Sequence, residues 1–430
     1  MSVVRSDPVG WLVDHQSYIN QWYRCCHHSP PDARCHRYVF RAEYFDVEKP
    51  HIAEPGTPSQ GSTASDRGLK GRKRKRKERE LNQGEVEALE YHKKVSLAIQ
   101  DGARKLVEHM EAQETGREGG SGQEMAVVLA DSMLIELCSM AKHLSEEAQQ
   151  QVQVITDESE AVLELLGRLT ENSTGRARLV RLMGHHYLLP PRCSFLLSDI
   201  SRVQLLLGYK KYDVITLDPP WENKSVKRSK GYSHLFPWQI RQLPVPLLSA
   251  PGCLVVCWVT NRQKHLHFVK EELFPSWSVH VVAEWHWVKV TRHGDFVVPL
   301  DSIHKKPYEI LVLGRYMGSS AQQGGEDVIT GNVTVPDRKL IVSVPCRLHS
   351  HKPPLGEVLK GLTRPHPECL ELFARNLQPG WTSWGNEVLR FQHLSYFQQL
   401  GPEQGEQSCC DSQTHQPFDP SLPQQPFVEQ

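Results

Sequence analysis

The residues with the clearest chemical potential are four consecutive ones, Asp218, Pro219, Pro220 and Trp221. They follow Asp213–Leu217, a run of apolar and β-branched residues that predicts a buried strand. Neither proline has an N–H to donate, so the segment offers only acceptors, namely the Asp218 carboxylate and main-chain carbonyls. With Trp221 as a stacking surface, this combination suits a flat heterocycle that carries an exocyclic amino group. A Pro-Pro turn beside a core tryptophan is the structural alternative.

Adenine is such a heterocycle, and its amino lone pair is delocalised into the ring, which makes it a poor nucleophile. Acceptors that draw both amino hydrogens favour a more tetrahedral nitrogen and free the lone pair for in-line attack on a sulfonium methyl group. Orientation supplies most of this effect, so no strong general base is required. The segment is therefore predicted to orient an amino group for methyl transfer.

The loop after Trp221 is rich in cations. Its polar residues include Asn223, Lys224, Lys227, Arg228 and Lys230. Four cations within seven positions, beside an aromatic ring, predict a loop that grips the phosphates of a nucleic acid. The cations expected to extend this surface are Lys289, Arg292, Lys305 and Lys306. For any one of them, an ordinary solvated charge is the alternative.

Asp218–Trp221 after an apolar strand resembles the catalytic motif of the MT-A70 family of adenine-N6 methyltransferases. Further segments agree, in the family's order: Cys257–Asn261, Trp285–Lys289, His304–Glu309, Ser350–Pro354, Glu371–Asn376 and Gly380–Glu387. The resemblance covers about Cys193 to Phe391. It implies a Rossmann-like, permuted methyltransferase domain in which the catalytic strand precedes the cofactor strand, although the chain has no Gly-x-Gly-x-x-Gly loop.

The resemblance also implies S-adenosylmethionine as cofactor. The residues that the family pattern assigns to it are Lys352 for the methionine carboxylate, Arg375 and Asn376 for the ribose or adenine, Asn386 and Glu387 over the nucleoside, and Ser194 and Phe195 at the adenine. Tyr232 matches an active-site-loop tyrosine, which is expected near the target base. A surface or solvated role is the alternative for each residue taken alone.

The implied substrate is the N6 amino group of adenine in nucleic acid. The resemblance favours RNA, in particular 2′-O-methyladenosine in small nuclear RNA, with adenine in DNA as a variant. The first alternative is a catalytically inactive scaffold subunit that binds nucleic acid. Relatives of that kind lose the acid or the aromatic residue of the motif, whereas Asp218 and Trp221 are both present. The second alternative is methylation of a protein amide or a small amine.

Strand and helix patterns alternate after Pro190, which predicts an α/β sheet covered on both faces. The predicted strands are Tyr212–Leu217, Cys253–Thr260, Val279–Val290, Tyr308–Leu313, Leu340–Val344 and Cys369–Phe373. The predicted helices between them are Gln239–Leu243, Gln263–Leu273 and Leu355–Leu362. Ligands of such sheets bind beyond the carboxyl ends of the strands.

The predicted organisation divides the chain into five parts. These are a small N-terminal element (1–48, with a strand at Tyr38–Phe45), a disordered linker (49–80), a helical region (81–190, with a Gly-rich hinge at 116–122 and helices at Glu124–Lys142 and Ser145–Leu169), the methyltransferase domain (191–396) and a disordered tail (397–430). An apolar stripe between Val86 and Met110 is expected to pack on its own protein, with a protein partner as the alternative.

The six cations of Arg72–Lys77 predict a signal for a nuclear import receptor, with a sliding contact for phosphates or a solvated charge cluster as the alternatives. The expected location is therefore the nucleus, with the cytosol as a second expected location. The formal net charge is zero, which excludes a uniformly basic protein and confines a nucleic-acid site to a local patch. No apolar run approaches the ~18–20 residues that span a bilayer. The eleven cysteines are expected to be reduced thiols, and the Cys25–His36 cluster lacks the spacing of common zinc sites, so no metal is predicted.

Overall fold

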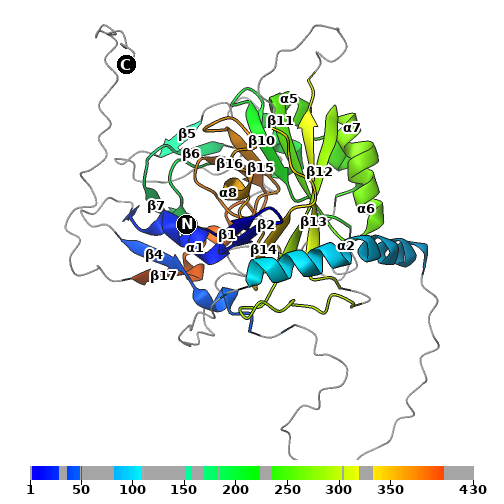
Figure 1. Cartoon of the computed structure of the whole chain (residues 1–430). Helices are drawn as coiled ribbons and strands as arrows, with labels where there is room; N and C mark the ends of the chain where they lie inside the picture. The colour runs from blue at the N-terminus through cyan, green and yellow to red at the C-terminus, as the bar shows by residue number, and fades with distance from the viewer. Residues whose placement is uncertain are drawn as a thin grey trace, which may run out of the picture.

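The computed structural model describes residues 2–28, 36–48, 50, 82–108, 110, 152–155, 168–182, 184–222, 235–302, 305–318 and 333–400. Its centre is a mixed sheet of twelve strands in the order β1-β2-β14-β12-β13-β11-β10-β15-β16-β9-β6-β5 (Figure 1). Their bounds are β1 Val3–Asp7, β2 Gly10–Val13, β5 Gln153–Ile155, β6 Leu169–Asn172, β9 Ser194–Leu197, β10 Tyr212–Leu217, β11 Ser249–Val259, β12 Val279–Lys289, β13 Tyr308–Tyr316, β14 Leu340–Ser343, β15 Cys369–Leu372 and β16 Trp381–Gly385. The predicted α/β fold is confirmed.

The middle of the sheet is built from strands that are apolar on both faces, as parallel strands between two covering layers must be. In β10, Val214 and Ile215 are both buried although they point to opposite faces. Strand β10 pairs in parallel with β11 on one side and with β15 on the other. Strand β13 is antiparallel to both β11 and β12, so the sheet is mixed.

One face of the sheet is covered mainly by α2 (Gln83–Val107), α4 (Pro237–Arg241), α5 (Val245–Leu248) and α6 (Gln263–His267), and the other by α8 (Gly356–Leu359). Figure 1 shows α2 crossing the sheet near β2 and β14. Asn82 and Glu85 form a capping box that fixes its start. Ile99, Ala103 and Leu106 bury its apolar stripe in the core of the same chain.

Residues outside the predicted domain also join the main sheet. Strands β1 and β2 form a hairpin whose β2 pairs in parallel with β14, so the N-terminal element extends the sheet edge. Two smaller sheets are β3 (Cys26–His28) with β7 (Ala177–Leu182) and β8 (His185–Leu189), and β4 (Arg37–Phe40) with β17 (Phe397–Leu400).

Several local predictions need correction. The strand at Tyr38–Phe45 ends at Phe40, and a 3₁₀ turn follows at Ala42–Phe45. The helical region predicted through residue 190 contains β5 to β8, because partners distant in sequence supply ladder bonds that local periodicity does not reveal. The tail predicted from residue 397 starts with β17, which pairs with β4. The remaining linker, hinge, helix and tail predictions (51–80, 116–122, Glu124–Lys142 and 401–430) lie outside the described residues.

Cys25 is disulfide-bonded, contrary to the expectation of reduced thiols throughout, whereas six other described cysteines are free and buried. Among the described residues, no group of three or more histidine, cysteine, aspartate or glutamate side chains could hold a metal ion. In the same part of the chain, no helix is both long and apolar enough to cross a membrane.

Candidate active site

The loops after β10 and β15 leave the sheet side by side at its carboxyl edge. From β10 the chain continues to β11 on one side, whereas β15 arrives later on the other side, so the connections diverge at this point. A crevice at such a switch point is where open α/β sheets bind ligands. Asp218 directly follows β10, and Arg375 lies three residues beyond the end of β15.

Asp218 lies between two cations at this switch point. Its Oδ2 accepts a hydrogen bond from Arg375 Nη1 at 2.9 Å and lies 3.7 Å from Lys352 Nζ. The three side chains are only 14%, 9% and 13% exposed, respectively. Asp218 Oδ1 has no partner among the described residues. The site therefore holds a carboxylate with one oxygen neutralised and the other available as an acceptor.

The ion pairing continues through Lys352 on one side. Lys352 Nζ donates to Glu309 Oε2, and the other oxygen of Glu309 accepts from Lys289 Nζ at 2.5 Å. Lys352 also lies over the Trp258 ring, 5.1 Å from its centroid. Lys289 ends β12 and Glu309 is the second residue of β13, so the antiparallel pairing of the two strands brings these charges together.

Burial raises the pKa of the Glu309 carboxyl, but the Lys289 and Lys352 ammonium groups outweigh burial and hold this pKa well below its usual range. Burial likewise lowers the pKa of Lys352, and the Asp218 and Glu309 carboxylates reverse this effect, so the pKa of Lys352 is raised. Lys352 is therefore a firmly charged cation at neutral pH.

On the other side, Arg375 connects Asp218 to Glu387. Arg375 Nε donates to Glu387 Oε2 at 3.1 Å, and Glu387 Oε1 accepts from Arg390 Nη1 at 2.7 Å. Positive and negative groups thus alternate along this chain of ion pairs. A zwitterion such as an amino-acid moiety could exchange into these pairs without leaving a buried charge unpartnered, so the residues fit the methionine part of S-adenosylmethionine.

Trp221 differs from its predicted role as an exposed stacking surface. It is 6% exposed, its Nε1 donates to the Trp258 carbonyl at 2.9 Å, and its ring stacks on His265 with centroids 4.9 Å apart. A buried indole N–H needs an acceptor, and the Trp258 carbonyl supplies it inside the protein. Trp221 therefore anchors the loop after Asp218, and His265 covers one face of its ring.

The two prolines place their carbonyls close to Asp218. The Pro219 carbonyl accepts from the Trp221 amide at 2.8 Å, and the Pro220 carbonyl accepts from the Leu235 amide at 3.2 Å. Each carbonyl oxygen has a second lone pair, so both keep the capacity for one further donor. The predicted acceptors are present, and main-chain hydrogen bonds already occupy one lone pair of each proline carbonyl.

The predicted cofactor residues fall into two groups. Lys352, Arg375 and Glu387 join the ion pairs above, Asn386 is exposed at the end of β16, and Asn376 is half-buried beside a small cavity that Tyr18 and His351 also line. Ser194 and Phe195 instead lie in the core at the start of β9, 4% and 0% exposed, and Ser194 Oγ is 2.9 Å from Thr382 Oγ1. Ligands of parallel sheets bind beyond the carboxyl ends of the strands, whereas these two residues lie at the amino end of β9, so their adenine role stays a prediction.

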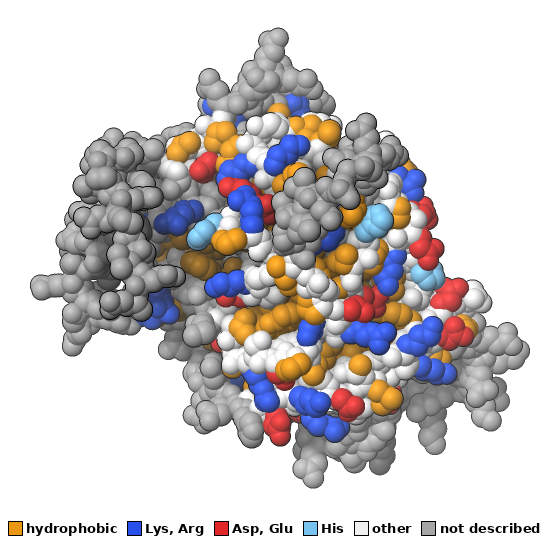
Figure 2. All heavy atoms as spheres, turned by 45° about the horizontal axis from the view of Figure 1, so that its top comes forward, with side chains coloured by type: hydrophobic (Ala, Val, Ile, Leu, Met, Phe, Trp, Pro, Cys, Tyr) orange, Lys and Arg blue, Asp and Glu red, His pale blue; other side chains and the backbone are white. Residues whose placement is uncertain are grey.

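The predicted phosphate-gripping loop, with Asn223, Lys224, Lys227, Arg228 and Tyr232, lies outside the described residues. Two of the cations expected to extend it have other partners: Lys289 pairs with Glu309, and Arg292 pairs with Asp46 at 2.6 Å. Figure 2 shows one face of the molecule, on which cationic and anionic side chains are interspersed.

Sequence reasoning missed the roles of Glu309 and Glu371. Glu309 stands in a segment that carries the resemblance, and a charged residue near the start of an otherwise apolar strand was the only signal of its importance. Glu371 lies on β15 next to the site, where its Oε2 accepts from Gln378 Nε2 at 2.9 Å. Burial, reinforced by Asp218, raises the pKa of Glu371 to about 7 against the opposing effects of Gln378 and Arg375.

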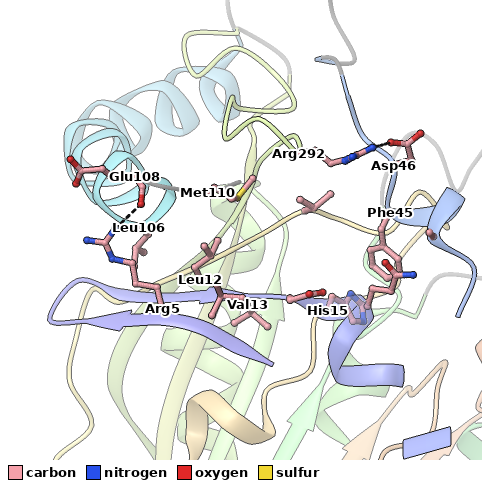
Figure 3. Close-up of a pocket in the computed structure, with 15 residues that line it drawn as sticks. Arg5, Leu12, Val13, His15, Phe45, Asp46, Leu106, Glu108, Met110 and Arg292 are labelled. Carbon is pink, nitrogen blue, oxygen red and sulfur yellow. Dashed lines mark hydrogen bonds and ion pairs between the residues drawn. The ribbon is translucent and has the colours of Figure 1, made fainter. Parts of the chain in front are cut away.

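A cavity of about 610 Å³ lies between the β1–β2 hairpin, the end of α2 and Phe45 (Figure 3). Arg5 Nη1 donates to the Glu108 carbonyl at 2.9 Å at one end, and the Arg292–Asp46 ion pair lies at the other. None of its lining residues belongs to the ion pairs around Asp218. The cavity is therefore separate from the candidate active site.

Known proteins are similar to this chain over the residues that form the candidate active site. The MT-A70 family profile matches residues 212–387, from the start of β10 to Glu387. The N(6)-adenine-specific methyltransferase METTL4 of Homo sapiens is 46% identical over 471 residues, which span 92% of this chain and 98% of that protein. The N6-methyladenosine RNA methyltransferase MTA1 of Pyricularia oryzae is 36% identical over 49% of this chain and 56% of its own length. The DNA N6-methyl methyltransferase of Caenorhabditis elegans is 34% identical over the same shares. Its sequence, fold and site geometry together place this chain in the MT-A70 family.

Proposed function

We propose that the chain is an S-adenosylmethionine-dependent methyltransferase that acts on the N6 amino group of adenine in nucleic acid. The observation that carries this proposal is the buried Asp218 carboxylate at the switch point of the sheet, neutralised at Oδ2 by Arg375 and Lys352 and open at Oδ1. Support also comes from METTL4 of Homo sapiens, named an N(6)-adenine-specific methyltransferase, which is similar over nearly the whole chain.

Asp218 and the proline carbonyls orient the target amino group. Asp218 Oδ1 accepts one amino N–H, and the second lone pair of the Pro219 or Pro220 carbonyl accepts the other. Arg375 and Lys352 both lie against Oδ2, so the Asp218 carboxylate presents Oδ1 as the acceptor for the target amino group. Trp221, anchored on Trp258 and His265, holds this loop in place. Fixed orientation lowers the barrier without a general base.

Lys352, Arg375, Glu387 and Asn386 are the residues that would hold the cofactor. When bound, S-adenosylmethionine supplies an electrophilic methyl group on a sulfonium sulfur. Lys352 carries the charge for the methionine carboxylate, and Glu387 carries acceptors suited to ribose hydroxyls. Because internal ion pairs already neutralise these groups, ligand binding exchanges partners and creates no new buried charge.

The decisive test compares two aspartates of the same strand and loop. Purified protein, a labelled methyl donor and adenine-containing oligonucleotides should give labelled N6-methyladenine. Asp218→Ala should reduce turnover at least a hundredfold while cofactor binding persists. Asp213→Ala is the control, because Asp213 lies at the opposite end of β10, paired with Arg364. Full activity of Asp218→Ala would refute the assignment, and an inactive wild type that still binds nucleic acid would favour the scaffold alternative.

RNA is the proposed substrate, with 2′-O-methyladenosine in small nuclear RNA as the target and DNA adenine as the variant. MTA1 of Pyricularia oryzae, named an RNA methyltransferase, supports the first, and the Caenorhabditis elegans relative, named a DNA methyltransferase, supports the second. Either target must be single-stranded or flipped out to expose its amino group. Oligonucleotides matched in sequence, with deoxyadenosine, adenosine or 2′-O-methyladenosine at one position, separate these substrates by kcat/KM.

We further propose that Arg72–Lys77 binds an import receptor and brings the protein to the nucleus. Six consecutive cations support this proposal. A fluorescent reporter that carries residues 67–79 should accumulate in the nucleus, and the same reporter with alanine at all six positions should not. Equal distribution of the two reporters would contradict the import role.

A further inference from the structure

An aromatic stack holds the loop that carries Lys352. His351, the preceding residue, is 3% exposed, and its ring stacks on Phe391 with centroids 4.1 Å apart and 20° between the planes. His15 meets the same ring edge-on, with centroids 4.6 Å apart and planes at 69°. The loop between β14 and α8 is thus held by the His15 ring from the N-terminal element and the Phe391 ring from the segment after β16.

The stack also connects both cations that hold Asp218. Lys352 is joined to His351 by a peptide bond, and the Phe391 amide donates to the Arg375 carbonyl at 3.0 Å. A shift of the His351 ring relative to Phe391 would therefore move Lys352 relative to Arg375. Because both cations contact Asp218 Oδ2, their relative position determines how that carboxylate is held.

His15 comes from the N-terminal element and closes the stack on its outer side. Residue 15 begins α1 (His15–Asn20), and Asp14 caps that helix by accepting from the Ser17 amide. Phe45 packs edge-on against the His15 ring at 5.1 Å. Figure 3 shows His15 and Phe45 next to each other beside the 610 Å³ cavity. His15 therefore lies between that cavity and the Lys352 loop.

A second connection runs from α1 to the loop after β15. Tyr18 Oη donates to Gln378 Oε1 at 3.4 Å, and Gln378 bonds Glu371 next to the active site. Tyr23 Oη accepts from Gln392 Nε2 at 2.7 Å, while Gln392 Oε1 accepts from the Leu377 amide at 3.2 Å. The N-terminal element thus contacts the loops of both cations through separate side chains.

His15 acts through the shape of its ring. Burial lowers the pKa of His15 to about 3, so the ring is neutral at physiological pH. Its Nδ1 is buried and makes no hydrogen bond within the described part of the chain. An apolar aromatic ring of similar size can therefore take its place without losing a polar contact.

We propose that the described part of the N-terminal element, residues 2–28 and 36–48, is a positioning part of the active site, and that His15 is the residue that fixes Lys352 and Arg375 against Asp218. His15 touches neither substrate nor cofactor and acts through the His351–Phe391 stack. The consequence for catalysis rests on the proposed function, whereas the positioning itself is a property of the protein without ligands.

The test is hydrogen–deuterium exchange of the full chain without cofactor, in wild type, His15→Ala and His15→Phe. His15→Ala should raise exchange at least tenfold in residues 348–355, and His15→Phe should restore it to within threefold of wild type. Leu12→Ala is the matched control, because Leu12 is buried in the same element and lines the same cavity but has no aromatic ring to join the stack. Its thermal stability should fall comparably, with exchange in 348–355 unchanged.

Unchanged exchange in His15→Ala, or an equal rise in Leu12→Ala, would overturn the proposal. Tyr18→Phe, which removes one hydroxyl only, should raise exchange in residues 375–379 and serves if His15→Ala does not fold. Binding of S-adenosylmethionine by calorimetry should weaken at least fivefold in His15→Ala and not in Leu12→Ala. A wild type that transfers no methyl group but shows the expected exchange pattern refutes the proposed function and leaves the positioning role intact.

Discussion

Titration of Glu371 should make the stability of this protein fall as the pH rises. Substitution of this one residue should remove that part of the pH dependence. Its carboxyl is buried next to Asp218, and burial raises its pKa from 4.5 to about 7. The folded state therefore holds this proton more tightly than the unfolded state. The resulting stabilisation is complete below pH 4.5 and is lost as the pH rises through 7. At 1.36 kcal/mol per unit, the whole loss is roughly 3 kcal/mol.

Glu371→Gln keeps the shape of the side chain, its amide oxygen can still accept from Gln378, and it does not titrate. We expect the free energy of unfolding of wild type to fall by roughly 3 kcal/mol relative to the variant between pH 4.5 and pH 8. Urea unfolding at intervals of half a pH unit measures this difference. Glu368→Gln, at a partly exposed carboxylate paired with Lys210, controls for the change in charge.

Parallel pH profiles for wild type and Glu371→Gln would refute the reasoning, because they would mean that Glu371 titrates alike in both states. A difference that grows toward low pH would reverse the sign and show that the charged form is the stabilised one. Only a variant that gains stability relative to wild type as the pH rises agrees with a carboxyl whose burial outweighs its contacts with Gln378 and Arg375.

Two further substitutions test the ion pairs and the anchor. Arg375→Ala should lower the free energy of unfolding, measured by urea unfolding, by about 2 kcal/mol. This is less than the ~3–5 kcal/mol of a fully broken buried pair, because Lys352 still faces Asp218 and Arg390 still pairs with Glu387. An unchanged free energy of unfolding would contradict a buried ion pair. Trp221→Phe should lower the free energy of unfolding by about 1–2 kcal/mol in the same assay, because the ring contact with His265 is kept and only the hydrogen bond to the Trp258 carbonyl is lost. A decrease above about 4 kcal/mol would mean that the ring contact is lost as well.

Local pattern was sufficient for the parts of this protein that depend on neighbouring residues. The predicted strand Tyr212–Leu217 matches β10 at both ends. Its apolar and β-branched residues favour the extended conformation, and the two prolines that follow Asp218 end the strand. The position of Asp218 at a strand end follows from the same run. The order of the motifs along the chain indicated that the catalytic strand precedes the cofactor strand, and the sheet order made β10 and β15 neighbours.

Tertiary structure decided which charges meet and which aromatic rings are buried. Arg375 and Asp218 are 157 residues apart, and His15 and His351 are farther still, so only the sheet order and the packed N-terminal element bring them together. The burial of Trp221, the core positions of Ser194 and Phe195 and the pairing of β17 with β4 have the same origin. The physical reason is that a buried donor, charge or strand edge must find a partner, and that partner can lie anywhere in the chain.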